Sequence, residues 1–64
     1  MANNILKSIS PKGFRLEAVL DAQGRNETHY IVRAPNGVIL EGKFDSVEAC
    51  AEKISQLDAA ASSH

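Results

Sequence analysis

His29 is the one histidine outside the C-terminal tail, and the predicted strand pairing places the carboxylate of Asp21 opposite it. An aspartate can orient an imidazole as a general base. A nucleophile is missing from this arrangement, because Cys50 falls on the apolar side of a predicted helix and is expected to be a small buried hydrophobe. The hydroxyl side chains that precede His29 have no glycine-rich turn beside them to hold an oxyanion. We therefore predict that the chain is not an enzyme and has no catalytic residues.

The composition argues against several other kinds of site. One cysteine and two histidines lack the short spacings of a zinc site, and the four glycines fall in predicted turns or strands rather than in a phosphate-binding loop. We predict no metal and no cofactor. Seven basic and eight acidic residues give a net charge of -1, without the basic excess usual in nucleic-acid-binding proteins.

Size and cysteine content bear on compartment and stability. A single cysteine cannot form a disulfide within its own chain and fits a reducing compartment. The first residues lack the apolar run of a signal peptide, and no stretch approaches the ~18 apolar residues of a membrane span. We expect a cytoplasmic protein that does not bind membranes. Its 64 residues form a single domain, and the core of so small a domain is marginally stable unless packing or self-association supplements it.

The C-terminal third of the chain has the pattern of a helix. Residues 46–61 carry apolar side chains every three or four positions, which predicts an amphipathic helix. Asp45 and Ser46 are both candidates for the N-cap, and Glu48 would complete a capping box with Asp45. We expect residues 62–64 to fray.

Four segments further upstream follow the period of two that is typical of half-buried strands. The predicted strands cover residues 5–10, 14–21, 28–34 and 38–44. Two of the turns, Ser10-Pro11-Lys12-Gly13 and Ala34-Pro35-Asn36-Gly37, have proline second and glycine fourth, which favours a three-residue hairpin loop. The predicted fold class is α+β: a small antiparallel β-meander of three to four strands with one C-terminal amphipathic helix packed on one face. The first segment stays open between a strand and a helical turn.

Turn geometry and charge pairing give an expected register. Lys7 and Arg33 are placed on either side of Glu17 in one row across three strands, and Val19 is placed beside both Ile5 and Ile31. The face toward the helix then supplies the predicted core: Leu6, Phe14, Leu16, Ala18, Leu20, Tyr30, Val32, Val38, Leu40, Phe44, Val47, Cys50, Ala51, Ile54 and Leu57.

Five aliphatic side chains point away from the helix in this register, on a face that should be solvated. Scattered surface aliphatics are common, but a cluster of them indicates an interface with a second copy or with a different protein. The predicted interface residues are Ile5, Ile9, Val19, Ile31 and Ile39. We expect a homodimer, through this face or through an edge strand, because self-association would also stabilise a small core.

Charged side chains are unevenly distributed along the chain. From residue 44 onward there are four acids and one base, whereas residues 1–43 hold six bases and four acids. A partner with a basic surface would contact the acidic helix, at Glu48, Glu52 and Asp58. Nucleic acid or an acidic partner would contact the sheet, at Arg15, Arg25, Arg33 and Lys43.

The predicted topology is similar to that of the arm-binding domains of tyrosine integrases and of double-stranded-RNA-binding domains. Those families carry dense lysine and arginine on the sheet or at the helix start, whereas this helix opens Asp45-Ser46-Val47-Glu48. We therefore predict a non-catalytic protein-protein interaction module, an adaptor or an inhibitor of a larger complex, such as a phage-encoded inhibitor of host defence. The alternative is a small nucleic-acid-binding regulator that uses the sheet face.

Overall fold

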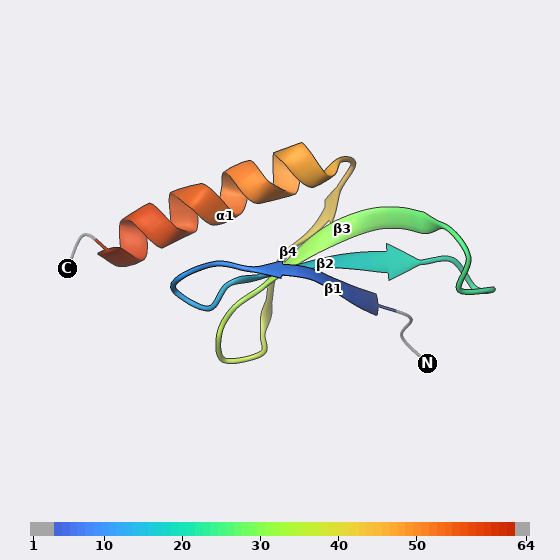
Figure 1. Ribbon diagram of the computed structural model, residues 1–64, viewed down its shortest axis with the longest axis horizontal. Helices are drawn as coiled ribbons and strands as arrows, with labels where there is room; N and C mark the ends of the chain where they lie inside the picture. The colour runs from blue at the N-terminus through green and yellow to red at the C-terminus, as the bar shows by residue number, and fades with distance from the viewer. Residues whose placement is uncertain (1–3, 63–64) are drawn as a thin grey trace.

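The protein is a four-stranded sheet followed by one helix (Figure 1). A computed structural model describes residues 4–62, except for the side chain of residue 41. The elements are β1 (Asn4–Ile9), β2 (Arg15–Leu20), β3 (Glu27–Arg33), β4 (Ile39–Phe44) and α1 (Val47–Ser62). The sheet is antiparallel, with strand order β1-β2-β3-β4. This is the predicted α+β meander, and its first segment is a strand. Residues 63–64 of the predicted frayed tail lie outside the described residues.

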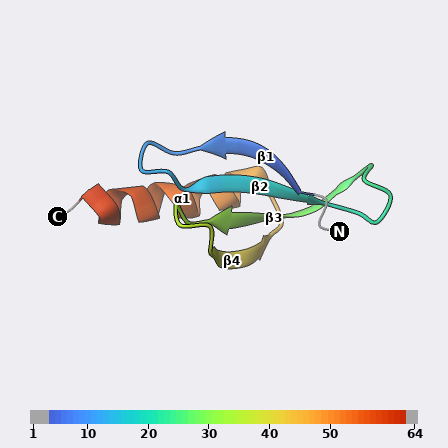
Figure 2. The same ribbon diagram turned by 90° about the horizontal axis from the view of Figure 1, so that it is seen from below.

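Helix α1 lies across one face of the sheet and leaves the other face open, as Figures 1 and 2 show from two directions. It packs against β2, β3 and β4. Cys50 and Ile54 of α1 are buried against Leu16 of β2 and Val32 of β3. Four partly buried side chains surround this core: Phe14, Tyr30, Phe44 and Leu57. No helix in the described part of the chain is long and apolar enough to cross a membrane.

The core is smaller than the sequence predicts. The predicted core residues that are exposed instead are Leu6, Val38, Leu40, Val47 and Ala51. One reason is geometric, because a helix about 10 Å wide cannot cover four strands that span roughly 19 Å, and side chains on the edge strands β1 and β4 stay in contact with solvent. Leu6 is exposed for a different reason, a bulge that turns it away from α1, and Val47 and Ala51 lie on α1 itself. Ala34, which follows β3, is buried although the predicted core does not include it.

The two proline-glycine turns form as predicted. In the first, Ser10 N donates to Phe14 O (2.8 Å) and Gly13 N donates to Ser10 O (2.9 Å). The second repeats these bonds between Ala34 and Val38 (2.8 Å) and between Gly37 and Ala34 (2.9 Å). Each turn ends on a glycine with φ of 95°, a backbone conformation that side chains with a Cβ avoid.

A bulge in β1 changes the predicted pairing of the first two strands. Lys7 is an extra residue in β1, between Leu6 and Ser8. Leu6 therefore lies opposite Glu17, where Lys7 was predicted, and Ile5 lies opposite Ala18 rather than Val19. The bulge exchanges the faces of the residues before it, so that Leu6 points to the open face and Ile5 to the helix face. The predicted faces of both residues are wrong for this reason.

The other two pairings also differ from the expected register. Glu17 lies opposite Ile31, so that Arg33 is its diagonal neighbour rather than its direct partner. Arg33 lies opposite Ile39, and Ile31 pairs with Gly42, because Leu40 is an extra residue in β4. Thr28 of β3 and Lys43 of β4 are also extra residues without a pairing partner. They form two further bulges, which interrupt the regular pairing near the start of β3 and the end of β4.

The N-cap of α1 is Ser46. Its Oγ accepts a hydrogen bond from the backbone N–H of Ala49 at 3.1 Å, and its carbonyl accepts the first intrahelical bond, from Cys50 N, at 3.2 Å. Of the two candidates from the sequence, Ser46 rather than Asp45 therefore satisfies a donor at the helix start.

The two turns give a matched pair of glycine substitutions. Gly13→Ala and Gly37→Ala each force a Cβ into the left-handed region, which costs about 1–2 kcal/mol of unfolding free energy. At Gly13 the added Cβ would lie 3.2 Å from Pro35 Cγ, whereas at Gly37 nothing lies within 4 Å. We expect Gly13→Ala to be the more destabilising variant in urea unfolding followed by circular dichroism. Equal losses would contradict close packing between the two turns.

The cap gives a second matched pair. Ser46→Ala removes the capping oxygen and should lower the free energy of unfolding by about 1 kcal/mol. Asp45→Ala, one residue earlier, should change it by less than about 0.5 kcal/mol. The same urea titration measures both, and a larger loss at Asp45 than at Ser46 would contradict the assignment of the cap.

Candidate functional site

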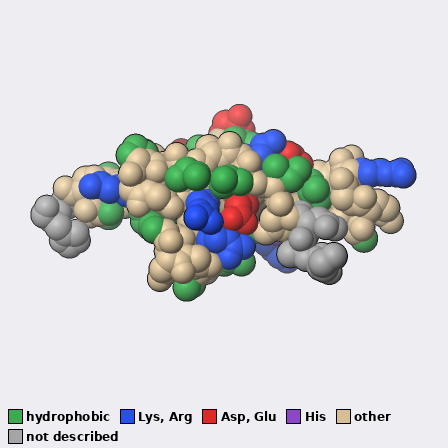
Figure 3. All heavy atoms as spheres, turned by 60° about the horizontal axis from the view of Figure 1, so that its bottom comes forward, with side chains coloured by type: hydrophobic (Ala, Val, Ile, Leu, Met, Phe, Trp, Pro, Cys, Tyr) green, Lys and Arg blue, Asp and Glu red, His purple; other side chains and the backbone are tan. Residues whose placement is uncertain are grey.

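The candidate site is the open face of the sheet, the face opposite α1 (Figure 2). Strand register assigns its side chains to three rows across the strands. The rows are Asn4, Val19 and His29; then Leu6, Glu17, Ile31 and Gly42; then Ile9, Arg15, Arg33 and Ile39. Below, "open face" means these residues. Figure 3 shows acidic and basic side chains in contact on this side of the molecule, with hydrophobic side chains around them.

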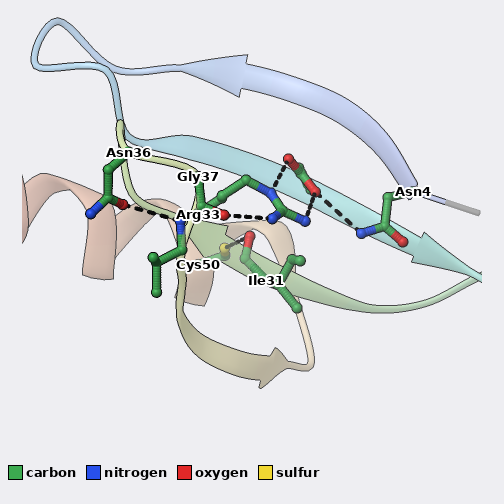
Figure 4. A network of polar contacts seen from close by, with 8 residues as sticks. Asn4, Ile31, Arg33, Asn36, Gly37 and Cys50 are labelled. Atoms are coloured by element: carbon green, nitrogen blue, oxygen red, sulfur yellow. Dashed lines mark hydrogen bonds and ion pairs between the residues drawn. The ribbon is translucent and has the colours of Figure 1, made fainter. Parts of the chain in front are cut away.

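An ion pair between Glu17 and Arg33 occupies the centre of the open face (Figure 4). Arg33 Nε donates to Glu17 Oε2 at 2.9 Å, and Arg33 Nη2 donates to Glu17 Oε1 at 3.2 Å. Asn4 Nδ2 also donates to Glu17 Oε1, at 3.2 Å, and Arg33 Nη1 donates to the Gly37 carbonyl at 2.8 Å. The pair thus links β1, β2, β3 and the β3–β4 turn across a face that has no helix to cover it.

Glu17 is unusually buried for a carboxylate on an open sheet face, with 8% of its surface exposed. The hydrogen bonds from Arg33 are the main reason why the pKa of Glu17 is lowered from 4.5, and burial acts in the opposite direction. The same interaction raises the pKa of Arg33. Both groups are therefore ionised at neutral pH, and their charges cancel within the open face.

Arg15 is the remaining charged side chain of the open face. It is exposed and lies directly opposite Arg33 on the neighbouring strand. It makes no hydrogen bond or ion pair with the side chains that the structure describes. Because Glu17 neutralises Arg33, Arg15 leaves the open face with one uncompensated positive charge.

Three large aliphatic side chains of the open face are exposed around the ion pair. They are Leu6 (49% exposed), Ile9 (56%) and Ile39 (49%). Val19, which the sequence also assigned to the interface, is half-buried. Ile31 lies on the open face but is only 4% exposed, and its Cγ2 packs over Gly42, so the prediction that it is exposed is wrong. Leu6 takes its place, and no signal in the sequence marked the bulge that turns it outward.

The edges of the sheet are less suited to binding than its open face. Edge strand β1 has its bulge at Lys7, and edge strand β4 has two bulges, with Lys43 at φ of 82°. Bulges and lysines interrupt the regular row of backbone donors and acceptors that an added strand needs. A partner would therefore meet side chains of the open face rather than backbone at either edge.

The other predicted binding residues are not gathered in one place. Arg25 lies in the loop between β2 and β3, at the end of β2 opposite to Arg15. Glu48 and Glu52 are exposed on α1, as an acidic surface requires. Asp58 is half-buried and accepts a 2.7 Å hydrogen bond from Ser10 Oγ, which ties the helix to the first turn.

The side chains with catalytic potential are each engaged elsewhere. Asp21 and His29 are not paired, because His29 lies opposite Val19. The carboxylate of Asp21 instead accepts hydrogen bonds from backbone and side-chain N–H groups of its own loop, at 2.9–3.1 Å. His29 Nδ1 lies 3.0 Å from Thr28 Oγ1. Cys50 is fully buried as predicted, its Sγ donates to the Ile31 carbonyl at 3.5 Å, and burial raises the pKa of its thiol.

The ion pair makes stability depend on pH. A carboxylate with a lowered pKa in the folded state adds stability above its unfolded pKa, and that stability is lost as the pH falls through the folded pKa. Arg33→Gln should raise the pKa of Glu17 and lower the free energy of unfolding by about 1–3 kcal/mol near pH 7. At a pH below the lowered folded-state pKa of Glu17 the difference from wild type should shrink, because Glu17 is then protonated in both proteins.

Urea unfolding at the two pH values measures this effect, and Arg15→Gln is the matched control. Arg15 lies opposite Arg33 but does not bond to Glu17, so its loss should cost less than about 0.5 kcal/mol. A loss for Arg33→Gln that is the same at both pH values would contradict the ion pair and assign the effect to packing of the arginine stem.

Comparison with known proteins adds no relative from which a role could be transferred. No protein-family model, curated protein or solved structure matches the chain. Within residues 4–62 there is no pocket, and no group of three or more histidine, cysteine or acidic side chains could hold a metal ion. The candidate site is therefore defined by the geometry of the open face itself.

Proposed function

We propose that the chain is a non-catalytic protein-binding module that docks through its open face. The observation that carries this proposal is the ring of exposed aliphatic side chains around a neutralised ion pair, on the one face that α1 does not cover. Exposed apolar clusters on small proteins mark sites of association. A module of this kind acts by occupying a surface of its partner, as an adaptor or an inhibitor of a larger complex does.

The internal hydrogen bonds of the open face favour docking. Burying a charge without a partner is costly, but Glu17 already accepts three hydrogen bonds within the chain. A partner that covers the face therefore desolvates a satisfied ion pair rather than a bare carboxylate. Arg15 supplies an exposed donor beside Ile9, and arginine among apolar side chains is a frequent component of protein interfaces.

The non-catalytic part of the proposal rests on where the reactive groups lie. Asp21 is used to hold a loop, and Cys50 is buried with a raised thiol pKa. The nucleic-acid alternative has less support, because Glu17 neutralises one of the two arginines on the open face. The single cysteine in the sequence supports placing the module in the reducing cytoplasm.

Site-specific photocrosslinking tests this function. A photoreactive phenylalanine derivative replaces Ile9 or Ile39 on the open face, or Val38 as the control. Val38 is as exposed as Ile9 (56%) but lies opposite Ala34, on the helix side of the sheet. After irradiation in the host that encodes the chain, we expect protein adducts from positions 9 and 39 and not from position 38.

Three outcomes would contradict this function. Equal adducts from all three positions would indicate random collisions, and no adducts from positions 9 and 39 would leave the open face without a partner. An adduct that nuclease removes would overturn the proposal in favour of the nucleic-acid alternative.

A further inference from the structure

We propose that the partner of the open face is a second copy of the chain, packed face to face about a two-fold axis perpendicular to the strands. This inference rests on the proposed function, because it names the partner of the same surface. Symmetric dimers are the commonest assemblies of soluble proteins, and a two-fold interface must complement itself. Two properties of the open face meet this requirement, its rows and its charges, and its area sets how strong the dimer can be.

The order of the rows selects the axis. If the axis were parallel to the strands, each row of one copy would pack against the same row of the second copy. Arg15 and Arg33 of one copy would then face Arg15 and Arg33 of the second copy. An axis perpendicular to the strands, passing at the level of Glu17, exchanges the outer rows. The row that holds Arg15 then meets the row that holds Val19 and His29, and no cation faces another. The central rows, with Leu6 and Ile31, meet each other.

The charges also fit this arrangement. Arg15 of one copy lies over Val19 of the second copy, one pair along the strand from that copy's Glu17. Alternate residues on a strand are ~6.6 Å apart, which an arginine side chain can reach. A carboxylate offers about four acceptor sites, and Glu17 uses three of them within its own chain. The fourth can accept a hydrogen bond from Arg15 of the second copy, so each Arg15 gains a hydrogen-bonding carboxylate, whereas within its own chain it acts on Glu17 only through its charge.

The area of the open face predicts a weak dimer. Four strands at ~4.8 Å spacing and six residues at ~3.3 Å rise give a face of roughly 19 by 20 Å. Its projected area of roughly 400 Å² is about half of the ~800 Å² that each partner buries in a standard stable interface. The accessible area that the dimer buries is larger than this projected area, because aliphatic side chains protrude from the face. We expect a dissociation constant in the micromolar range or weaker.

Sedimentation equilibrium on the purified full chain is the first test. From about 5 µM to about 1 mM, the apparent mass of the wild type should rise from 6.9 kDa toward twice that value. Ile9→Asp and Ile39→Asp should weaken the association at least tenfold. The control, Val38→Asp, matches Ile9 in exposure but lies opposite Ala34 on the helix side of the sheet, and it should stay within about twofold of the wild type.

Nuclear magnetic resonance of the wild type tests the same inference without any substitution. On dilution, amide shifts should change for open-face residues and stay constant for exposed α1 residues such as Glu52. In a sample that mixes labelled and unlabelled chains, contacts from Arg15 should reach Val19 of the second copy. Contacts from Arg15 to Arg15 or Arg33 of the second copy would overturn the perpendicular axis.

The outcomes separate this inference from the proposed function. A monomer at about 1 mM overturns the second copy as partner, and adducts from position 9 to a different protein would then leave the proposed function standing. A monomer that also gives no adducts overturns both. A dimer that Ile9→Asp and Val38→Asp weaken equally overturns the assignment to the open face.

Discussion

The ion pair between Glu17 and Arg33 is the interaction on which the uncovered half of this small protein depends. Helix α1 packs apolar side chains against one face of the sheet. The core of the protein is limited to the side chains that α1 contacts there. On the other face, the guanidinium of Arg33 joins β3 to β2 and to the β3–β4 turn, while Asn4 adds β1. Hydrogen bonds thus order a surface that burial alone would leave weakly held.

The sequence predicted those features of the fold that depend on local chemistry. The period of two, the helical period and the two proline-glycine turns follow from backbone preferences of a few consecutive residues, and the structure contains all of them. The register depends on bulges, and a bulge adds one residue without a strong compositional signal. Lys7 is such a residue, and it exchanges the faces of Ile5 and Leu6.

The candidate site was partly predictable for the same reason. Ile9, Val19 and Ile39 lie on the open face because their strands keep the expected alternation there. The proximity of Glu17 and Arg33 was also expected, although they are diagonal neighbours and Ile31 occupies the position directly opposite Glu17. The burial of Ile31 could not be read from alternation, since alternation assigns a side chain to a face but not to an exposed fraction, and Ile31 is 4% exposed.

The ion pair also determines what the open face can accept. If Glu17 were unpaired, a partner would have to supply a cation at the centre of the face, and an apolar surface would be excluded by the cost of desolvating a carboxylate. Because Arg33 already neutralises Glu17, the centre of the face tolerates apolar contact, and the charge requirement moves to Arg15. The interaction that stabilises the open face would therefore also set the chemistry of the proposed partner: aliphatic over most of the contact, with an acceptor placed for one arginine.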